Sequence, residues 1–126
     1  MSLFELLHQV TREIPECVHT SVIDRDSGMA LASVSPLTSS DAAAASDAYQ
    51  SDILRALEQA QDALEISPGL ESMMLTSQAH VFIAQPLSQG QYVWHVVTSI
   101  NTTVGFTQAI MRKHRASLQQ SMMTLV

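Results

Sequence analysis

Residues that commonly build metal sites, nucleotide sites and disulfide scaffolds are scarce in this sequence. It has one cysteine and four glycines, and neither aspartate nor glutamate occurs after Glu71. A single cysteine excludes an intramolecular disulfide and a multi-cysteine zinc site. The glycines stand far apart, so the sequence has no glycine-rich phosphate loop and no GxSxG motif. Chemistry that needs a carboxylate side chain must therefore use residues 1–71.

Long apolar runs are also missing. None approaches the roughly 20 residues that a membrane-spanning helix requires. Glu5 interrupts the apolar N-terminal stretch, which lacks the basic segment of a signal peptide. A net charge of −6 disfavours non-specific binding to nucleic-acid phosphates. With 46% hydrophobic residues among 126, we expect one globular cytoplasmic domain, residues 1–126, without nucleic-acid binding or membrane insertion.

The charges are separated along the chain. Residues 1–71 carry twelve acidic and three basic side chains, a net charge of −9, whereas residues 72–126 carry three basic side chains and no acidic one. Those three are expected on the exposed side of a C-terminal helix, and they are Arg112, Lys113 and Arg115. Their candidate ion-pair partners belong to the N-terminal helix region: Glu5, Glu13 and Glu16.

A short amphipathic helix is predicted at the N-terminus. Ser2 and Glu5 have the spacing of a capping box, in which each side chain bonds to the backbone amide of the other. Apolar residues then recur at the intervals of one helical face, and Pro15 ends the pattern. The members of this face are Leu3, Leu7, Val10 and Ile14.

Two strands and a long helix are predicted next. Residues 18–23 are rich in β-branched side chains, and a turn at 25–28 leads into a second strand at 29–34. Neither strand alternates cleanly between apolar and polar residues, which indicates a sheet covered by helices on both faces. The long helix is capped by Ser40 or Ser46. Its apolar face comprises Tyr49, Ile53, Leu57, Ala60 and Leu64.

Three more strands and a last helix complete the predicted order α-β-β-α-β-β-β-α. The strands are expected at 72–76, 80–84 and 92–98, with a three-residue turn at 88–90 before the last of them. The last helix opens near Thr102 or Thr103. Its inward face is expected to contain Phe106, Ile110, Met111, His114, Leu118 and Met122.

No catalytic residue, cofactor or metal site is predicted. Cys17 and His19 point to one face if this segment is extended, but strand neighbours two apart are roughly 7 Å from each other, too far for a direct hydrogen bond. His80 and His95 lie on adjacent strands of a hairpin. A three-residue turn pairs His80 with Thr98, which puts the two imidazoles on opposite faces of the sheet. Shared metal ligation is therefore not expected.

The segment from Ser72 to Thr76 carries no charge. An uncharged strand at a bare sheet edge promotes association, since its unpaired backbone groups are free to bond with another strand. Either this strand is central in the sheet or another chain covers it. The sequence therefore indicates self-association.

With these elements in place, nearly the whole chain resembles a domain of the roadblock/LC7 family. The resemblance is most specific in the hairpin from Thr20 to Ser33, with its segment Asp24-Arg25-Asp26-Ser27-Gly28. The first helix ending at Pro15, the long second helix, the meander from Met73 to Thr98 and the entry to the last helix at Asn101 to Gly105 complete it. The alanine- and serine-rich region from Thr38 to Ser46 departs from the family pattern.

The resemblance implies an α+β fold, with a five-stranded antiparallel sheet, the long helix on one face and the two terminal helices on the other. It also implies a dimer, either a homodimer or a roadblock heterodimer, in which the third strands pair edge to edge and the second helices pack together. The dimer residues would be Tyr49, Ile53, Leu57, Met73, Met74 and Leu75.

In function, the resemblance implies a noncatalytic regulator or scaffold that binds a Ras-like small GTPase or a paralogous roadblock subunit. The residues expected to contact the partner on the second helix are Gln50, Leu54, Arg55, Glu58 and Gln61. A different class of function is a small-molecule sensor of PAS or GAF type. That function needs a pocket between sheet and helices, for which the strands offer His80, Trp94 and His95.

Overall fold

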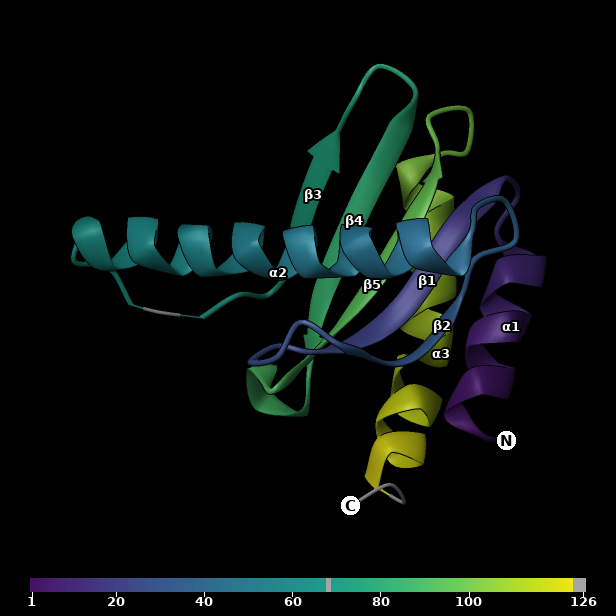
Figure 1. Cartoon of the computed structure of the whole chain (residues 1–126), viewed down its shortest axis with the longest axis horizontal. Helices are drawn as coiled ribbons and strands as arrows, with labels where there is room; N and C mark the ends of the chain where they lie inside the picture. Colours follow the sequence, from purple (N-terminus) through teal and green to yellow (C-terminus); the bar gives the residue numbers. More distant parts are fainter. Residues whose placement is uncertain (68, 124–126) are drawn as a thin grey trace.

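The computed structural model, which describes residues 1–67 and 69–123, contains three α-helices and a five-stranded sheet (Figure 1). The elements are α1 (Leu3–Glu13), β1 (Cys17–Asp24), β2 (Ala30–Val34), α2 (Ser40–Ala63), β3 (Met73–Thr76), β4 (His80–Leu87), β5 (Tyr92–Ser99) and α3 (Val104–Met123), with a 3₁₀ turn, η1 (Ser88–Gly90), between β4 and β5. This order confirms the predicted α-β-β-α-β-β-β-α arrangement.

The strands are antiparallel and lie in the order β2-β1-β5-β4-β3, so that β1 and β5 occupy the middle and β2 and β3 form the edges. Helices α1 and α3 lie together on one face, and α2 crosses the other face (Figure 1). Both the predicted sheet and the predicted distribution of helices over its two faces are confirmed.

Helix α1 forms as its local sequence predicts. The Ser2 hydroxyl accepts a hydrogen bond from the Glu5 backbone amide at 3.1 Å, and it lies 3.2 Å from the Glu5 carboxylate. Leu3, Leu7 and Val10 are buried along one face of the helix. The cap satisfies an amide that has no partner within the helix, and the apolar stripe holds the helix on the sheet.

The main hydrophobic core lies between the sheet and the α1/α3 pair. Trp94 on β5 is fully buried here, and its indole N–H donates to Thr20 Oγ1 on β1 at 2.9 Å. The other buried members come from every element on this side: Leu3, Leu6, Leu7, Val10, Ile14, Cys17, Val22, Val81, Ile83, Leu87, Val96, Met111, Leu118 and Met122. Of the residues predicted to face inward from α3, Phe106 is instead 45% exposed, and Thr107 takes the buried position.

The β4–β5 pairing differs by one residue from the predicted register. Leu87 pairs with Tyr92, so His80 lies opposite Ser99 and His95 opposite Ala84. The turn is one residue longer than expected, because η1 adopts a 3₁₀ conformation with Gln89 at φ 60°. The prediction that His80 and His95 face opposite sides is therefore wrong, since both lie on the α2 face. Along β4, His80 lies four residues from Ala84, which is the position opposite His95. The two imidazoles are therefore still too far apart to bind one metal ion.

A β-bulge alters the start of β1. The β1–β5 register shifts between Cys17, which pairs with Thr98, and His19, which pairs with Val97. The extra residue reverses the alternation of side chains. Cys17 consequently packs into the α1/α3 core, whereas His19 faces α2. The expectation that both side chains share a face is wrong.

The N-cap of α2 differs from both predicted caps, since it lies one residue before Ser40 and seven before Ser46. Ser39 is the N-cap, and its hydroxyl accepts from the Ala42 amide at 3.1 Å. The residues of α2 buried against the sheet are Ala43, Asp47, Gln50, Ser51 and Leu54. The apolar face predicted for this helix lies elsewhere: Tyr49 is 70% exposed and Ile53 is 39% exposed.

Candidate protein-interaction surface

A hydrogen-bonded polar layer joins α2 to the sheet. His19 Nε2 on β1 donates to Asp47 Oδ1 on α2 at 2.7 Å, and Ser21 Oγ donates to the same oxygen at 2.9 Å. Ser35 Oγ lies 2.7 Å from the other imidazole nitrogen of His19. His19 and Asp47 are almost completely buried. A buried carboxylate with two donors specifies one position of α2 on the sheet, because other positions leave it unpaired.

His95 on β5 extends this layer. Its Nδ1 donates to Gln50 Oε1 on α2, and Ser21 is its direct neighbour across the β1–β5 pair. Burial lowers the pKa of His95 to about 4, although the nearby Asp47 carboxylate opposes the shift. His95 is therefore neutral at physiological pH. Among the described residues, neither His95 Nε2 nor Asp47 Oδ2 has a hydrogen-bond partner.

Cys17 does not have the surroundings of a nucleophile. Its thiol is buried, and burial raises its pKa to about 11. A reactive cysteine needs the opposite shift, towards the thiolate at neutral pH. The bulge in β1 also separates the thiol from the His19 imidazole.

The three residues expected to serve a small-molecule sensor are not brought together. Trp94 faces the α1/α3 core, and His95 is enclosed beneath Gln50. Of the three, His80 lines a cavity of about 240 Å³ between the start of α2 and the sheet. Phe82 lines the same cavity, as does His19, which is bonded to Asp47 and Ser35. Thr38 and Ser46 line it too, whereas neither Trp94 nor His95 does. The cavity therefore does not combine the polar groups that the sensor hypothesis named.

An apolar groove runs between α2 and the β3 edge. It has a volume of about 580 Å³, with Tyr49 and Ile53 on its α2 wall and Met73, Leu75 and Phe82 on its floor. β3 carries no charge and forms the outer edge of the sheet. Leu75 is 43% exposed. We call this region, defined by Tyr49, Ile53, Met73, Leu75 and Phe82, the α2–β3 groove.

The predicted dimer residues divide between three locations. Tyr49, Ile53, Met73 and Leu75 line the α2–β3 groove. Met74 pairs with Ile83, so it faces the side of α1 and α3, where it is 47% exposed. Leu57 is half-buried in the C-terminal half of α2 and is not among the residues that line the groove.

The predicted partner-binding residues also have different environments. Gln50 and Leu54 are buried against the sheet, so they do not belong to an exposed docking surface. Arg55 pairs with Asp52, and Glu58 pairs with Arg25 of the β1–β2 turn. Gln61 donates to the Gly69 carbonyl at 3.1 Å. The accessible part of the predicted surface therefore comprises Arg55, Glu58 and Gln61.

Sequence reasoning missed Asp47 and Ser21 as parts of the α2 interface. The signal was present, because Asp47, Gln50, Ser51 and Leu54 fall on one helical face at i, i+3, i+4 and i+7. That face is mostly polar, so a search for apolar periodicity selects the neighbouring Tyr49 stripe instead. His19 and Ser21 likewise lie two apart on β1 and share the α2 side of the sheet.

Residues 1–67 and 69–123 contain neither a metal-binding cluster nor a membrane-spanning helix. No group of three histidine, cysteine, aspartate or glutamate side chains there is arranged to hold a metal ion. None of the helices in these segments combines the length and apolar character needed to cross a membrane.

Comparison with known proteins supports the fold. Neither protein-family models nor curated proteins match the sequence. Among solved structures, a roadblock/LC7 domain from Streptomyces avermitilis superposes with a TM-score of 0.83 at 12% identity, covering 98% of this chain and 99% of that one. Myxococcus xanthus MglB gives 0.81 at 10% identity, with 97% and 95% covered. A structure described as MglB with tetrameric arrangement gives 0.80 at 13% identity, with 94% and 86% covered. The chain therefore has the roadblock/LC7 fold.

Proposed function

We propose that residues 1–126 form a single cytoplasmic roadblock-type domain that acts without catalysis, as a dimeric regulator or scaffold. Its partner would be a Ras-like small GTPase or a paralogous roadblock subunit. The α2–β3 groove beside an uncharged sheet edge is the observation that carries this proposal. The roadblock/LC7 fold of the chain supports the same conclusion.

The groove and the end of α2 fit a two-fold symmetric dimer. The groove leaves apolar side chains exposed next to β3, while the C-terminal half of α2 projects beyond that same edge (Figure 1). In an isologous dimer, each surface meets its counterpart on the other copy. Pairing of the two β3 edges would use their open backbone groups, and each projecting α2 would cover the groove of the partner.

Assembly among proteins of this fold agrees with such an arrangement. The MglB structure named above is described as tetrameric. A symmetric dimer formed through β3 would leave the β2 edges and the α1/α3 faces free for any further contact.

A charged residue on β3 tests the dimer. Leu75→Arg is expected to weaken self-association about hundredfold, because the arginine would have to be buried without a partner at about 3 kcal/mol. Light scattering should give twice the 13.7 kDa chain mass for the natural sequence and the single chain mass for this variant.

Leu31→Arg is the matched control for that experiment. Leu31 is as exposed as Leu75, at 43%, but it lies on β2, the opposite edge of the sheet. Its substitution should leave the mass unchanged. A natural chain that is monomeric at micromolar concentration, or equal effects of the two variants, would contradict the proposed interface.

Binding to a GTPase would use the outward side of α2. The N-terminal 71 residues carry the negative charge of the chain, which favours a partner surface with basic side chains. A regulator must also bind one nucleotide state more tightly, since it shifts an equilibrium only by that difference in affinity.

Pull-down with a Ras-like GTPase encoded near this chain, loaded with GDP or a GTP analogue, should show unequal binding. Glu58→Lys should weaken the stronger interaction, because it replaces an acidic side chain of the proposed surface with a positive charge. Equal or absent binding in both states would exclude the regulatory role.

A further inference from the structure

A polar hollow lies on the other face of the sheet, where α3 approaches the beginning of β3. Its volume is about 410 Å³. The lining residues come from three places, the segment before β3, β4 and α3: Glu71, Ser72, Gln85, Gln108, Arg112 and Arg115. None of these lining residues is among those named above for the dimer or for the GTPase surface.

Three hydrogen-bond donors of α3 line one side of the hollow. Gln108, Arg112 and Arg115 are spaced i, i+4 and i+7, which aligns them along one helical face. The Arg115 guanidinium is fixed in place, since it donates to Gln85 Oε1 at 3.0 Å and to the Pro86 carbonyl at 2.5 Å. Arg115 is therefore a fixed part of the lining, next to Arg112 and Gln108 on the same helical face.

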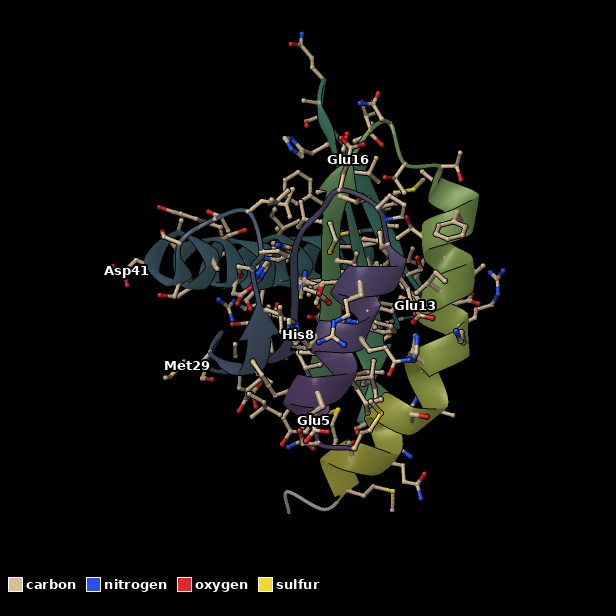
Figure 2. All side chains as sticks on the ribbon, turned by 90° about the vertical axis from the view of Figure 1, so that its right-hand side faces the viewer. Glu5, His8, Glu13, Glu16, Met29 and Asp41 are labelled. Atoms are coloured by element: carbon tan, nitrogen blue, oxygen red, sulfur yellow. The ribbon has the colours of Figure 1, made fainter. Side chains whose placement is uncertain are left out.

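The positive charge of α3 is available on this side only. On the neighbouring side, Glu13 pairs with both Lys113 and His114, and Figure 2 shows Glu13 at the junction of α1 and α3. Arg112 is exposed and, within residues 1–67 and 69–123, makes no side-chain hydrogen bond or ion pair. Among the described residues that line the hollow, Glu71 is the one acidic residue.

From this geometry we infer that the hollow binds an acidic segment of a partner protein, with a carboxylate side chain of that segment seated on Arg112. Arginine is suited to this ligand, because its planar guanidinium makes two parallel hydrogen bonds to one carboxylate. Gln108 and Ser72 add uncharged donors around it. The surface is polar and presents no apolar anchor, so charge complementarity is its means of selection.

A labelled peptide of eight glutamates tests this site. Fluorescence anisotropy at low salt should show binding to the full chain, and the affinity should fall as salt is added. Arg112→Gln should weaken binding about tenfold or more, since it removes the guanidinium that would pair with a peptide carboxylate. An equivalent peptide of glutamines should not bind.

Lys113→Gln is the matched control, because it removes one positive charge from the adjacent residue, which Glu13 already neutralises. Peptide affinity should stay within about twofold of the natural chain. The inference would be overturned by equal losses in the two variants, which indicate non-specific attraction, or by no binding at low salt. It would also be overturned if Arg112→Gln lowered the mass seen by light scattering, because the occupant would then be a second copy of this chain.

Discussion

At the scale of single residues, the polar layer beneath α2 determines how the protein responds to acid. Asp47, His19 and His95 are all buried there, and His95 is neutral because burial lowers its pKa to about 4. An unfolded chain exposes this imidazole to water, where its pKa is about 6.5. Below that value the unfolded state binds a proton that the folded state does not bind, so the free energy of unfolding falls as the pH decreases from about 6.5 towards 4.

The difference between the folded and unfolded pKa of His95 predicts a measurable loss of stability in a pH range where most carboxylates remain ionised. Between pH 7.5 and 5.5, His95 should lower the free energy of unfolding by about 1 kcal/mol. His95→Gln removes the titrating group and should flatten this part of the urea-unfolding profile. His8→Gln, at an exposed position on α1, should keep the slope of the natural chain. An unchanged slope in His95→Gln would show that another group is responsible.

At the scale of elements, one carboxylate of α1 bonds to two side chains of α3, beside the apolar contacts of the main core. Glu13 bonds to Lys113 and His114. The Lys113 hydrogen bond is the largest cause that holds the pKa of Glu13 below its usual value, with His114 acting in the same direction against the effect of burial. Of the three glutamates expected to pair with the basic cluster, Glu13 makes the contacts. Glu5 lies in the first turn of α1, and Glu16 follows the end of the helix (Figure 2).

Glu13→Gln should therefore weaken the α1–α3 contact. We expect a cost of about 1 kcal/mol at pH 7, because the exposed Lys113 loses its countercharge and the buried His114 loses a carboxylate hydrogen-bond partner. A group with a lowered folded pKa stabilises the protein above its unfolded value, so the difference between variant and natural chain should vanish as the pH falls through the Glu13 titration. Thermal unfolding of both proteins at pH 7 and at pH 3 measures this difference in stability. Glu16→Gln, which removes an exposed charge beyond α1, is expected to have no effect, and an equal loss there would contradict the pairing.

The elements also show which features of the fold could be predicted from sequence. α1 was predictable because its cap and its apolar stripe are local patterns that tertiary contacts do not override. The β4–β5 register was not, since it depends on Gln89 adopting a left-handed conformation that a single sequence does not indicate. The inward face of α2 was hidden for a different reason, because Asp47 and Gln50 are buried by hydrogen bonding and not by hydrophobicity.

At the scale of the whole molecule, the two helical layers are unequally supported. The α1/α3 side rests on the main hydrophobic core, whereas the cluster of fully buried apolar residues beneath α2 consists of Leu54, Ala84 and Val93. Hydrogen bonds within a protein contribute little net stability compared with extensive apolar burial. Helix α2 therefore depends on additional contacts, which in the proposed dimer the second copy supplies over the α2–β3 groove.

Hydrogen exchange of the natural chain and of Leu75→Arg tests this dependence. If dimerisation stabilises α2, the amides of α2 should exchange about tenfold or more faster in the variant, because local opening is governed by the contacts that each element makes. The amides of β1 and β5 should be unaffected, since these strands lie in the centre of the sheet. Leu31→Arg should leave α2 protected. Equal protection of α2 in all three proteins would mean that the polar layer holds the helix without a partner, and that the groove serves another purpose.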